Sequence, residues 1–331
     1  MIISRTPFRV SFFGGGTDYP AWYLANGGAV FSTTIDKYCY ITCRQLPPFF
    51  DHKFRIAYSK IEHAREISDI QHPSVRAVLS EFSISNGLEI HHDSDLPARS
   101  GLGSSSAFTV GLINSLKALG GHAISKQELA KQAIHIEQNV IKETVGSQDQ
   151  IAVAHGGLNR IDFERDNTFR ISPVILPGER RNMFEKNLML FFTGFSRFAT
   201  DIAQAKVSNF GRKERELRLI RDMVDESIRI LQSDSESLDR FGSLLHESWM
   251  HKKSLADVIS SVEIDSIYET ARKNGALGGK LLGAGGGGFM LLFVPPQRHG
   301  AVREALRNLI YVPFSFETQG SQIILYDPQK A

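Results

Sequence analysis

The chain has 331 residues, of which 42% are hydrophobic and 22% are charged, so it can bury a large core and is long enough for two domains. Its formal net charge of +2 argues against a role in binding nucleic acid or anionic membranes. The start, M-I-I-S-R-T-P-F-R-V, lacks the features of a signal peptide, and no apolar run approaches bilayer length, so we expect a cytoplasmic protein.

Strands and helices are predicted to alternate in the first half. Strands are expected at 9–13, 29–44, 54–58 and 88–92, and a helix begins at Pro73. A serine-rich helix ends at Gly120-Gly121, and the capping box of Ser125 and Glu128 opens a long helix that carries Glu137. Cys39 and Cys43 have no second Cys or His pair at metal-site spacing, so we interpret them as reduced structural thiols.

The second half is predicted to be rich in helices. The polar stretch 164–181 is the best linker candidate, which divides the chain into domains of residues 1–180 and 181–331. The expected elements are strands at 187–193, 289–294, 312–316 and 323–326 and helices at 217–231, 241–255, 264–271 and 297–309. This pattern is compatible with an α+β fold but does not distinguish it from a mixed α/β sheet.

The segment 97–108, P-A-R-S-G-L-G-S-S-S-A-F, has the construction of a phosphate cradle. Gly101 and Gly103 let backbone amides approach a ligand, and the helix that follows presents unpaired N–H groups and a positive dipole end. The serines at 104–106 add hydroxyl donors or a magnesium ligand. Glycine and serine are also ordinary loop and capping residues, so a purely structural turn is the alternative.

Other nucleotide and metal motifs fail on context. The glycines at 283, 285 and 288 match G-x-G-x-x-G but run into a strand instead of opening a helix. Gly279-Lys280 lacks the remainder of a Walker A motif. His246-Glu247 is followed by His251, one position beyond the spacing of a zinc-protease helix.

Three segments together resemble the GHMP kinases, named for galacto-, homoserine, mevalonate and phosphomevalonate kinases. They are R-T-P-F-R-V-S-F-F-G-G-G-T-D-Y from residue 5, P-x-x-x-G-L-G-S-S-S-A from residue 97 and K-L-L-G-A-G-G-G-G-F from residue 280. They stand in family order and span residues 5 to 289. Within the family, the segments 137–150 and 193–197 look most like those of bacterial heptose 7-phosphate kinases, with fucokinase and glucuronokinase domains as relatives.

The resemblance implies an α+β fold of two domains with the active site between them. The N-terminal domain is expected to be α/β and similar to ribosomal S5 domain 2, and the C-terminal domain is expected to be ferredoxin-like. The implied reaction is transfer of a phosphoryl group from ATP, with Mg²⁺, to the anomeric hydroxyl of D-glycero-D-manno-heptose 7-phosphate. L-fucose or a uronic acid as acceptor, and a non-catalytic regulator that binds sugar or nucleotide, remain alternatives. A homodimer is left open.

The resemblance also implies roles for individual residues. Asp149 orients or deprotonates the acceptor hydroxyl, Arg9 balances its charge, and Ser105 and Glu137 hold Mg²⁺. The residues assigned to the phosphates of ATP are Pro97, Ser100, Gly101, Leu102, Gly103, Ser104, Ser105 and Ser106. Those assigned to the acceptor are Arg5, Gly14, Gly15, Gly16, Thr17, Asp18, Arg197, Gly283, Gly285 and Gly286, with Arg197 suited to a phosphate already on the sugar.

Each of these residues has a structural alternative. Glu137 fits a solvated carboxylate on a helix face, and Asp149 fits a turn. Asp18 fits the cap of a helix that starts at Tyr19-Pro20, and Arg9 fits a surface position on a strand. The last glycine loop fits a close packing contact between strand and loop. Local sequence leaves these alternatives open.

Overall fold

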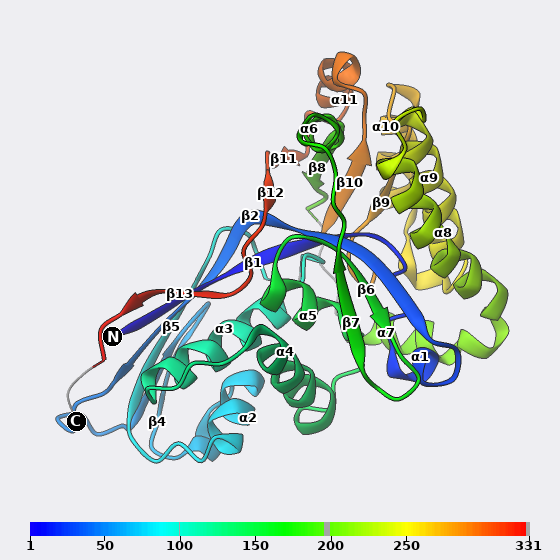
Figure 1. Ribbon diagram of the computed structural model, residues 1–331. Helices are drawn as coiled ribbons and strands as arrows, with labels where there is room; N and C mark the ends of the chain where they lie inside the picture. The colour runs from blue at the N-terminus through cyan, green and yellow to red at the C-terminus, as the bar shows by residue number, and fades with distance from the viewer. Residues whose placement is uncertain (99, 195–198, 329–331) are drawn as a thin grey trace.

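The structure is a computed structural model that describes residues 1–98, 100–194 and 199–328. Two separate sheets and the helices beside them form two domains (Figure 1). The strands are β1 (Ile2–Phe13), β2 (Gly28–Gln45), β3 (Phe54–Ala57), β4 (Ile61–Ala64), β5 (Leu88–Ser94), β6 (Leu158–Phe163), β7 (Phe169–Pro173), β8 (Leu188–Phe192), β9 (Gly278–Leu281), β10 (Phe289–Phe293), β11 (Ile310–Tyr311), β12 (Phe316–Glu317) and β13 (Gln322–Tyr326).

Helices account for most of the remaining ordered chain. The α-helices are α1 (Pro20–Asn26), α2 (Pro73–Glu81), α3 (Ser104–Leu119), α4 (Lys126–His135), α5 (Gln148–His155), α6 (Gly178–Lys186), α7 (Ala199–Ser208), α8 (Glu214–Gln232), α9 (Asp239–Lys253), α10 (Val262–Lys273) and α11 (His299–Ala305). A π-helix, η2 (Ile136–Val140), directly continues α4, and short 3₁₀ turns are η1 (Ile67–Asp69), η3 (Phe210–Arg212), η4 (Asp257–Ile259) and η5 (Pro296–Arg298).

The first domain is a nine-stranded sheet with α2 to α5 on one side (Figure 1). Its central strands β1 and β2 pair antiparallel and support α3. Gly111 lets α3 approach closely, because a Cβ there would lie 3.0 Å from Oγ1 of Thr6, and Oγ of Ser4 donates to the Gly111 carbonyl at 2.9 Å. This packing holds the N-terminal end of α3 beside the end of β1.

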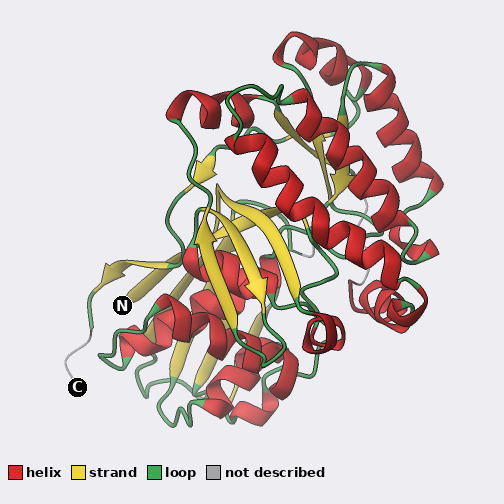
Figure 2. Ribbon diagram, turned by 45° about the vertical axis from the view of Figure 1, so that its right-hand side comes forward, coloured by secondary structure: helices red, strands yellow, loops and turns green. Residues whose placement is uncertain are grey.

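The second domain is a four-stranded antiparallel sheet in the order β11-β8-β10-β9, with helices beside it (Figure 2). Helices α9 and α10 pack against β9, whereas α8 packs against α9 and against β1 and β2 of the first sheet. Strand β10 is buried along its full length, as its run of apolar residues predicts. The α+β architecture in two domains is therefore confirmed.

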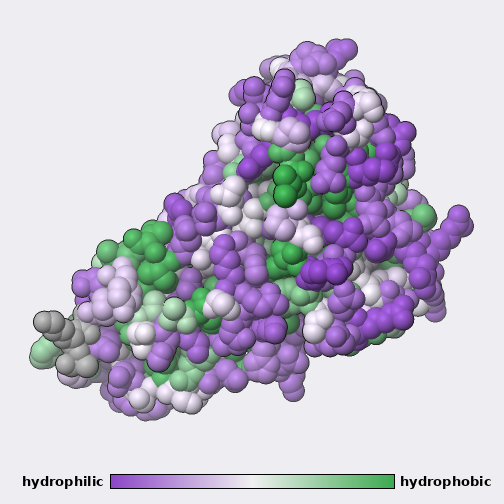
Figure 3. All heavy atoms as spheres, viewed as in Figure 1, coloured by the Kyte–Doolittle hydropathy of each residue, from purple (hydrophilic) through white to green (hydrophobic). Residues whose placement is uncertain are grey.

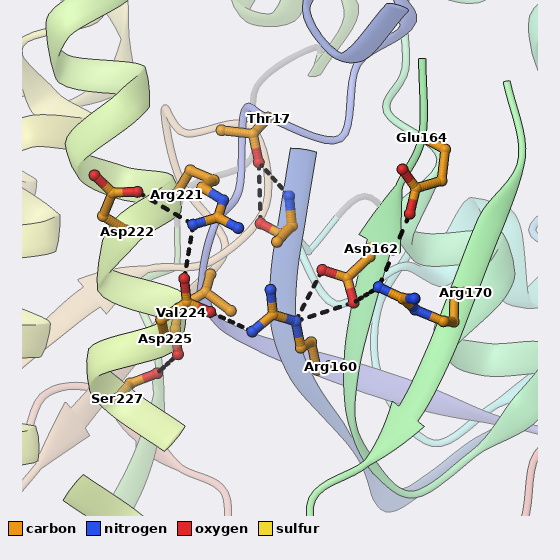
Figure 4. Close-up of polar contacts among 11 residues, drawn as sticks. Thr17, Arg160, Asp162, Glu164, Arg170, Arg221, Asp222, Val224, Asp225 and Ser227 are labelled. Atoms are coloured by element: carbon orange, nitrogen blue, oxygen red, sulfur yellow. Dashed lines mark hydrogen bonds and ion pairs between the residues drawn. The ribbon is translucent and has the colours of Figure 1, made fainter. Parts of the chain in front are cut away.

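Aromatic packing and an ion-pair network join the domains. The ring of Phe12, at the end of β1, packs at a tilt against Phe184 of α6 and edge to face against Phe241 of α9, with ring centres 5.3 and 5.8 Å apart. Arg160 of β6 pairs with Asp162 at 2.8 Å and also binds Asp225 of α8 (Figure 4). The apolar contacts carry most of this interface, because partly exposed ion pairs contribute little.

Two features of the chain path differ from expectation. The stretch 164–181, expected to be a linker, contains β7, which pairs with β6, and the start of α6. Its polarity reflects an exposed edge strand and a surface helix. After β11 the chain returns to the first sheet, where β12 pairs with β2 and β13 with β1. The predicted boundary at residue 180 places β12 and β13 in the second domain, whereas both strands pair with strands of the first sheet.

Ser125 is confirmed as the N-cap residue of α4, since its hydroxyl accepts from the amide of Glu128 at 3.2 Å. The second half of the predicted capping box is not found among the hydrogen bonds of the described residues, because Oε1 of Glu128 accepts from Gln132 instead. Both cysteines are buried and free.

Within the described residues, no helix is long and apolar enough to cross a bilayer. The surface in Figure 3 is mostly hydrophilic, with an apolar patch over the edge strand β13, where Ile324 and Tyr326 are exposed.

A buried carboxylate on β5 is expected to make the fold sensitive to acid. Burial alone would raise the pKa of Glu89, but hydrogen bonds from His91, Arg44 and Arg55 outweigh burial and lower it from 4.5 to about 2. Because this pKa is depressed in the folded state, the stabilisation is present above pH 4.5 and is lost as pH falls toward 2.

We therefore expect Glu89→Gln to lower the free energy of unfolding by roughly 2 to 3 kcal/mol at pH 7. The difference from the unmodified protein should shrink between pH 4.5 and pH 3, as measured by urea unfolding. Glu304→Gln is the control, because Glu304 is 74% exposed in its ion pair with Arg307. If Glu89→Gln lowered the free energy of unfolding by the same amount at every pH, this explanation would be contradicted.

Candidate active site

A cavity of about 910 Å³ lies between the two domains. The turn after β1, the loop before α3, the start of α5 and helix α7 all contribute to its lining, as do α9 and the loop between β9 and β10. The predicted site residues that line it are Arg9, Gly15, Gly16, Asp18, Pro97, Gly101, Gly103, Ser104, Ser105, Ser106, Glu137, Asp149, Gly283 and Gly285. The fold thus brings together residues from four segments of the chain, at 9–18, 97–106, 137–149 and 283–285.

Arg9 and Asp149 form a bidentate ion pair at the centre of this cavity. Nε and Nη2 of Arg9 donate to the two carboxylate oxygens of Asp149 at 2.7 and 2.6 Å. Nη1 of Arg9 donates to the Gly101 carbonyl at 2.6 Å, so the same guanidinium joins the carboxylate to the glycine loop. Arg9 is only 3% exposed, whereas Asp149 is 24% exposed and accessible from the cavity. The surface-strand alternative for Arg9 is therefore wrong.

The glycine–serine loop opens α3 with a left-handed backbone. Gly101 and Gly103 have φ of 83° and 76°, and Gly103 is the N-cap residue of α3 without a capping side chain. A Cβ on Gly103 would lie 3.2 Å from Cγ of Arg9. The amides of the first turn and the hydroxyls of Ser104 and Ser105 stand at the cavity, an arrangement suited to an anion.

The last glycine loop packs directly against the glycine–serine loop. A Cβ on Gly283 would lie 2.6 Å from Cα of Gly101, and a Cβ on Gly288 would overlap the Ser100 carbonyl oxygen. The amide of Phe289 donates to that same carbonyl at 3.1 Å. Gly288 therefore serves the close packing between the two loops. Gly283 and Gly285 line the cavity as well.

We expect Gly288→Ala to destabilise the protein by roughly 3 kcal/mol, because the new methyl group meets backbone at a φ of 103°. Thermal unfolding followed by circular dichroism would measure this loss. Gly300→Ala on α11 is the matched control, since its methyl group would meet open space. If both variants unfolded at the same temperature, the close contact between the loops would be refuted.

Glu137 is buried beneath the serine-rich end of α3. It lies in the π-helix η2, and its Oε2 accepts hydrogen bonds from Oγ of Ser106, at 3.0 Å, and from Nε2 of Gln150. Its Oε1 is buried with no hydrogen-bond partner in the described part of the chain. Burial raises the pKa of Glu137 to about 7. The solvated-carboxylate alternative for Glu137 is therefore wrong.

This carboxylate fits a magnesium ligand. An unpartnered buried oxygen needs a cation or a proton, and Mg²⁺ prefers hard oxygen ligands. The hydroxyl that contacts Glu137 belongs to Ser106, whereas the predicted ligand, Ser105, is exposed at the cavity lining. The assignment of Ser105 stays a prediction, and Ser106 joins it as a second candidate.

Some residues of the turn after β1 line the cavity, and others point into the protein core. Gly15, Gly16 and Asp18 line the cavity, and Oδ1 of Asp18 accepts from the Gly16 amide at 2.8 Å. Thr17, labelled in Figure 4, is turned inward, where its Oγ1 lies 2.8 Å from the carbonyl oxygen of Gly14 and 3.0 Å from that of Ala29. Tyr19 is the N-cap residue of α1, and no side chain caps that helix. The capping alternative for Asp18 is therefore wrong.

Several predicted residues lie away from the cavity. Arg5 packs over the Tyr38 ring and donates to Gln322, because it stands on the other side of the first sheet. Gly14, Thr17, Ser100, Leu102 and Gly286 are not among the residues that line the cavity. Arg197 lies outside the described residues.

Three buried lysines at the cavity were not predicted: Lys206, Lys252 and Lys280. Lys252 donates to the carbonyls of Leu281 and Gly283, both at 2.7 Å, and Lys280 donates to that of Phe12 at 2.9 Å. Burial lowers the pKa of all three, and nearby Arg9 helps to lower that of Lys280 to about 7. A cluster of desolvated cations favours a polyanionic ligand. The lysines stand on different elements, so their sequence spacing contains no signal of the cluster.

The far end of the cavity is aromatic. Phe108 of α3 stacks on His72 with ring centres 4.5 Å apart, and Tyr58 and His92 meet these rings edge to face. All four line the cavity. This end suits the planar, apolar part of a ligand.

Comparison with known proteins supports the same interpretation. Two family models match: "GHMP kinases N terminal domain" over residues 70–157 and "GHMP kinases C terminal" over residues 227–312. The chain is 31% identical to D-glycero-alpha-D-manno-heptose 7-phosphate kinase of Campylobacter jejuni, over 96% of this chain and 97% of that protein. The chain belongs to the GHMP kinase family.

This GHMP kinase has further relatives. It is 26% identical to the L-fucokinase/L-fucose-1-P guanylyltransferase of Bacteroides fragilis, over 92% of this chain but 36% of that longer protein. A crystal structure of a D-glycero-D-manno-heptose 1-phosphate kinase from Bacteroides thetaiotaomicron matches its fold with a TM-score of 0.79, at 22% identity, over 97% of this chain and 98% of that one. As a GHMP kinase, the protein is a phosphotransferase with ATP as its phosphate donor.

Proposed function

We propose that this GHMP kinase transfers the γ-phosphoryl group of ATP to the anomeric hydroxyl of D-glycero-D-manno-heptose 7-phosphate. The observation that carries the proposal is the bidentate pair of Arg9 and Asp149, tied through the Gly101 carbonyl to the loop that opens α3. A proton acceptor is thereby held beside an anion-binding helix end, which is the arrangement that phosphoryl transfer to an alcohol needs.

In this reaction Asp149 accepts the proton of the sugar hydroxyl while that oxygen forms its bond to the γ-phosphorus. The bond from phosphorus to the bridging oxygen breaks, and ADP leaves with the electron pair. Arg9 holds the Asp149 carboxylate in one orientation, since two parallel N–H···O bonds allow little rotation. Burial of Arg9 within the protein makes this orientation stiff.

Glu137, with Ser106 or Ser105, would hold Mg²⁺. The metal would neutralise charge on the phosphate oxygens when bound. Lys252 and Lys280 bring two amino groups to the cavity from the second domain. The aromatic end around Phe108 would take the base of the nucleotide, which leaves Gly15, Gly16 and Asp18 for the sugar.

The choice of acceptor draws on the relatives. The Campylobacter jejuni protein is named for heptose 7-phosphate and the Bacteroides thetaiotaomicron protein for heptose 1-phosphate. Similarity to the fucokinase keeps L-fucose as a second candidate. A cytoplasmic location and a homodimer stay predictions.

A panel of acceptors tests the proposal. The purified protein, with ATP and Mg²⁺, would be assayed for ADP release with heptose 7-phosphate, heptose 1-phosphate, L-fucose and glucuronic acid, and phosphorus NMR would identify the position of the new phosphate. We expect the highest kcat/KM for heptose 7-phosphate and an anomeric phosphate in the product. A higher kcat/KM for another acceptor, or a phosphate at another position, would reject the proposed substrate.

A further inference from the structure

Four buried cations line the cavity, and three of them are held by the protein itself. Arg9 binds Asp149 and the Gly101 carbonyl. Lys252 and Lys280 donate to main-chain carbonyls, as described above. These three groups have fixed positions whatever the cavity contains.

Lys206 differs from the other three. It projects from α7, is 4% exposed, and its ammonium lies 4.2 Å from the centre of the Tyr19 ring. Within residues 1–98, 100–194 and 199–328, no oxygen accepts a hydrogen bond from its Nζ. An ammonium has three donors, and Lys206 lines the cavity, so these donors are available to a group bound there. The Lys206 side chain is therefore poised to donate to a ligand.

The surroundings of Lys206 identify the kind of ligand group. Asp18 and Asp149 are its charged neighbours, and both raise the pKa of Lys206 against the lowering effect of burial. Neither carboxylate forms an ion pair with Lys206 among the pairs found in the described chain. Arg9 already pairs with Asp149, which leaves Asp18 as the carboxylate that opposes Lys206. A hydroxyl between these two groups can accept from the ammonium and donate to the carboxylate.

Asp18 is the carboxylate on the sugar side. It is 1% exposed, and Oδ1 is already oriented by the Gly16 amide. Gly146 packs so closely on this side chain that any Cβ there would overlap Oδ2. Tyr19, the next residue, supports the Lys206 ammonium through its ring, so both charged groups are positioned by the same short turn.

We propose that Lys206 and Asp18 bind one ring hydroxyl of the sugar acceptor from opposite sides, with Lys206 donating to its oxygen and Asp18 accepting its proton. This inference rests on the proposed function, because it names how the acceptor of that reaction is selected. Lys206 is then a specificity residue for a hydroxyl, and not a ligand of ATP or of the phosphate on the sugar.

The test is a double-mutant cycle in which one side chain of the protein and one hydroxyl of the substrate are removed, first singly and then together. Unmodified protein, Lys206→Met and Asp18→Asn would be assayed with the preferred acceptor of the panel and with its monodeoxy analogues. We expect at least a 100-fold loss in kcat/KM for one monodeoxy analogue with the unmodified protein. With the full acceptor, the kcat/KM of Lys206→Met should be about 100-fold lower than that of the unmodified protein. In Lys206→Met, however, the kcat/KM values for the full acceptor and for that same analogue should differ less than threefold.

Two further measurements separate this role from a general loss of structure. The KM for ATP should change less than threefold in Lys206→Met, and Lys206→Arg should restore part of the acceptor kcat/KM. Lys213→Met, at a partly exposed ion pair with Glu216, is the control and should behave as the unmodified protein.

The outcomes distinguish the inference from the proposed function. If Lys206→Met lowers kcat/KM equally for the acceptor and for every analogue, or raises the KM for ATP as much as that for sugar, the shared hydroxyl is refuted. If the unmodified protein prefers another sugar, the proposed substrate fails, and the cycle on that sugar still decides the role of Lys206. Absence of turnover with every sugar would overturn both.

Discussion

Replacing Asp149 by Asn is expected to lower kcat about 1,000-fold while the KM for ATP changes less than threefold. The amide is close in size to the carboxylate but cannot accept the proton of the sugar hydroxyl. Arg9 keeps its bonds to the Gly101 carbonyl, so the phosphate-binding loop should retain its shape. Initial rates of ADP release at saturating sugar, with and without the substitution, measure the effect.

Asp166→Asn is the control, because Asp166 is fully exposed in the turn between β6 and β7 and bonds only locally to Thr168. The thermal midpoint of Asp149→Asn should lie within a few degrees of that of the unmodified protein. A kcat within tenfold of the original value would show that Asp149 orients the acceptor without taking its proton.

The second large effect is expected at Glu137, where activity and stability should move in opposite directions. Replacement by Gln removes a carboxylate oxygen that fits Mg²⁺, so kcat/KM should fall at least 100-fold. The same change removes a buried charge. Because burial raises the pKa of Glu137 to about 7 from 4.5, its stabilisation is fully present below pH 4.5 and is lost as pH rises through 7.

The Glu137→Gln variant, which stays neutral, should therefore exceed the unmodified protein in free energy of unfolding by roughly 3 kcal/mol at pH 8 and by little at pH 5. Urea unfolding at both pH values measures this. Mg²⁺ with a non-hydrolysable ATP analogue should raise the thermal midpoint of the unmodified protein at pH 8 more than that of the variant.

Glu164→Gln, at a half-exposed carboxylate near Arg170, is the matched control and should change neither activity nor stability measurably. Equal thermal shifts by Mg²⁺ in both proteins would remove Glu137 from the metal site. A variant less stable than the original at pH 8 would contradict the explanation of the raised pKa.

The sequence determined a good part of the fold and of the candidate site. The glycines at 101 and 103 need a left-handed backbone, and the serines after them open a helix, so local chemistry predicts the shape of this loop. Its role in binding phosphate stays a prediction. The N-cap at Ser125 and the apolar run of β10 depend on residues that are close in the sequence, so the sequence predicts both. Arg9 and Asp149 came from the family resemblance, and the structure joins them in one ion pair.

Other features depend on contacts between distant segments, and only the tertiary structure decided them. Lys206, Lys252 and Lys280 look like ordinary surface residues until three elements place them at one cavity. Arg5 and Arg9 stand on the same strand, but the bulge between Pro7 and Phe8 and the packing of α3 decide which of them faces the site. The periodicity of side chains in the sequence predicts which residues share a face of a single helix or strand. The burial and the pKa of a side chain depend on the other elements that pack against that face, and these are set by the tertiary structure.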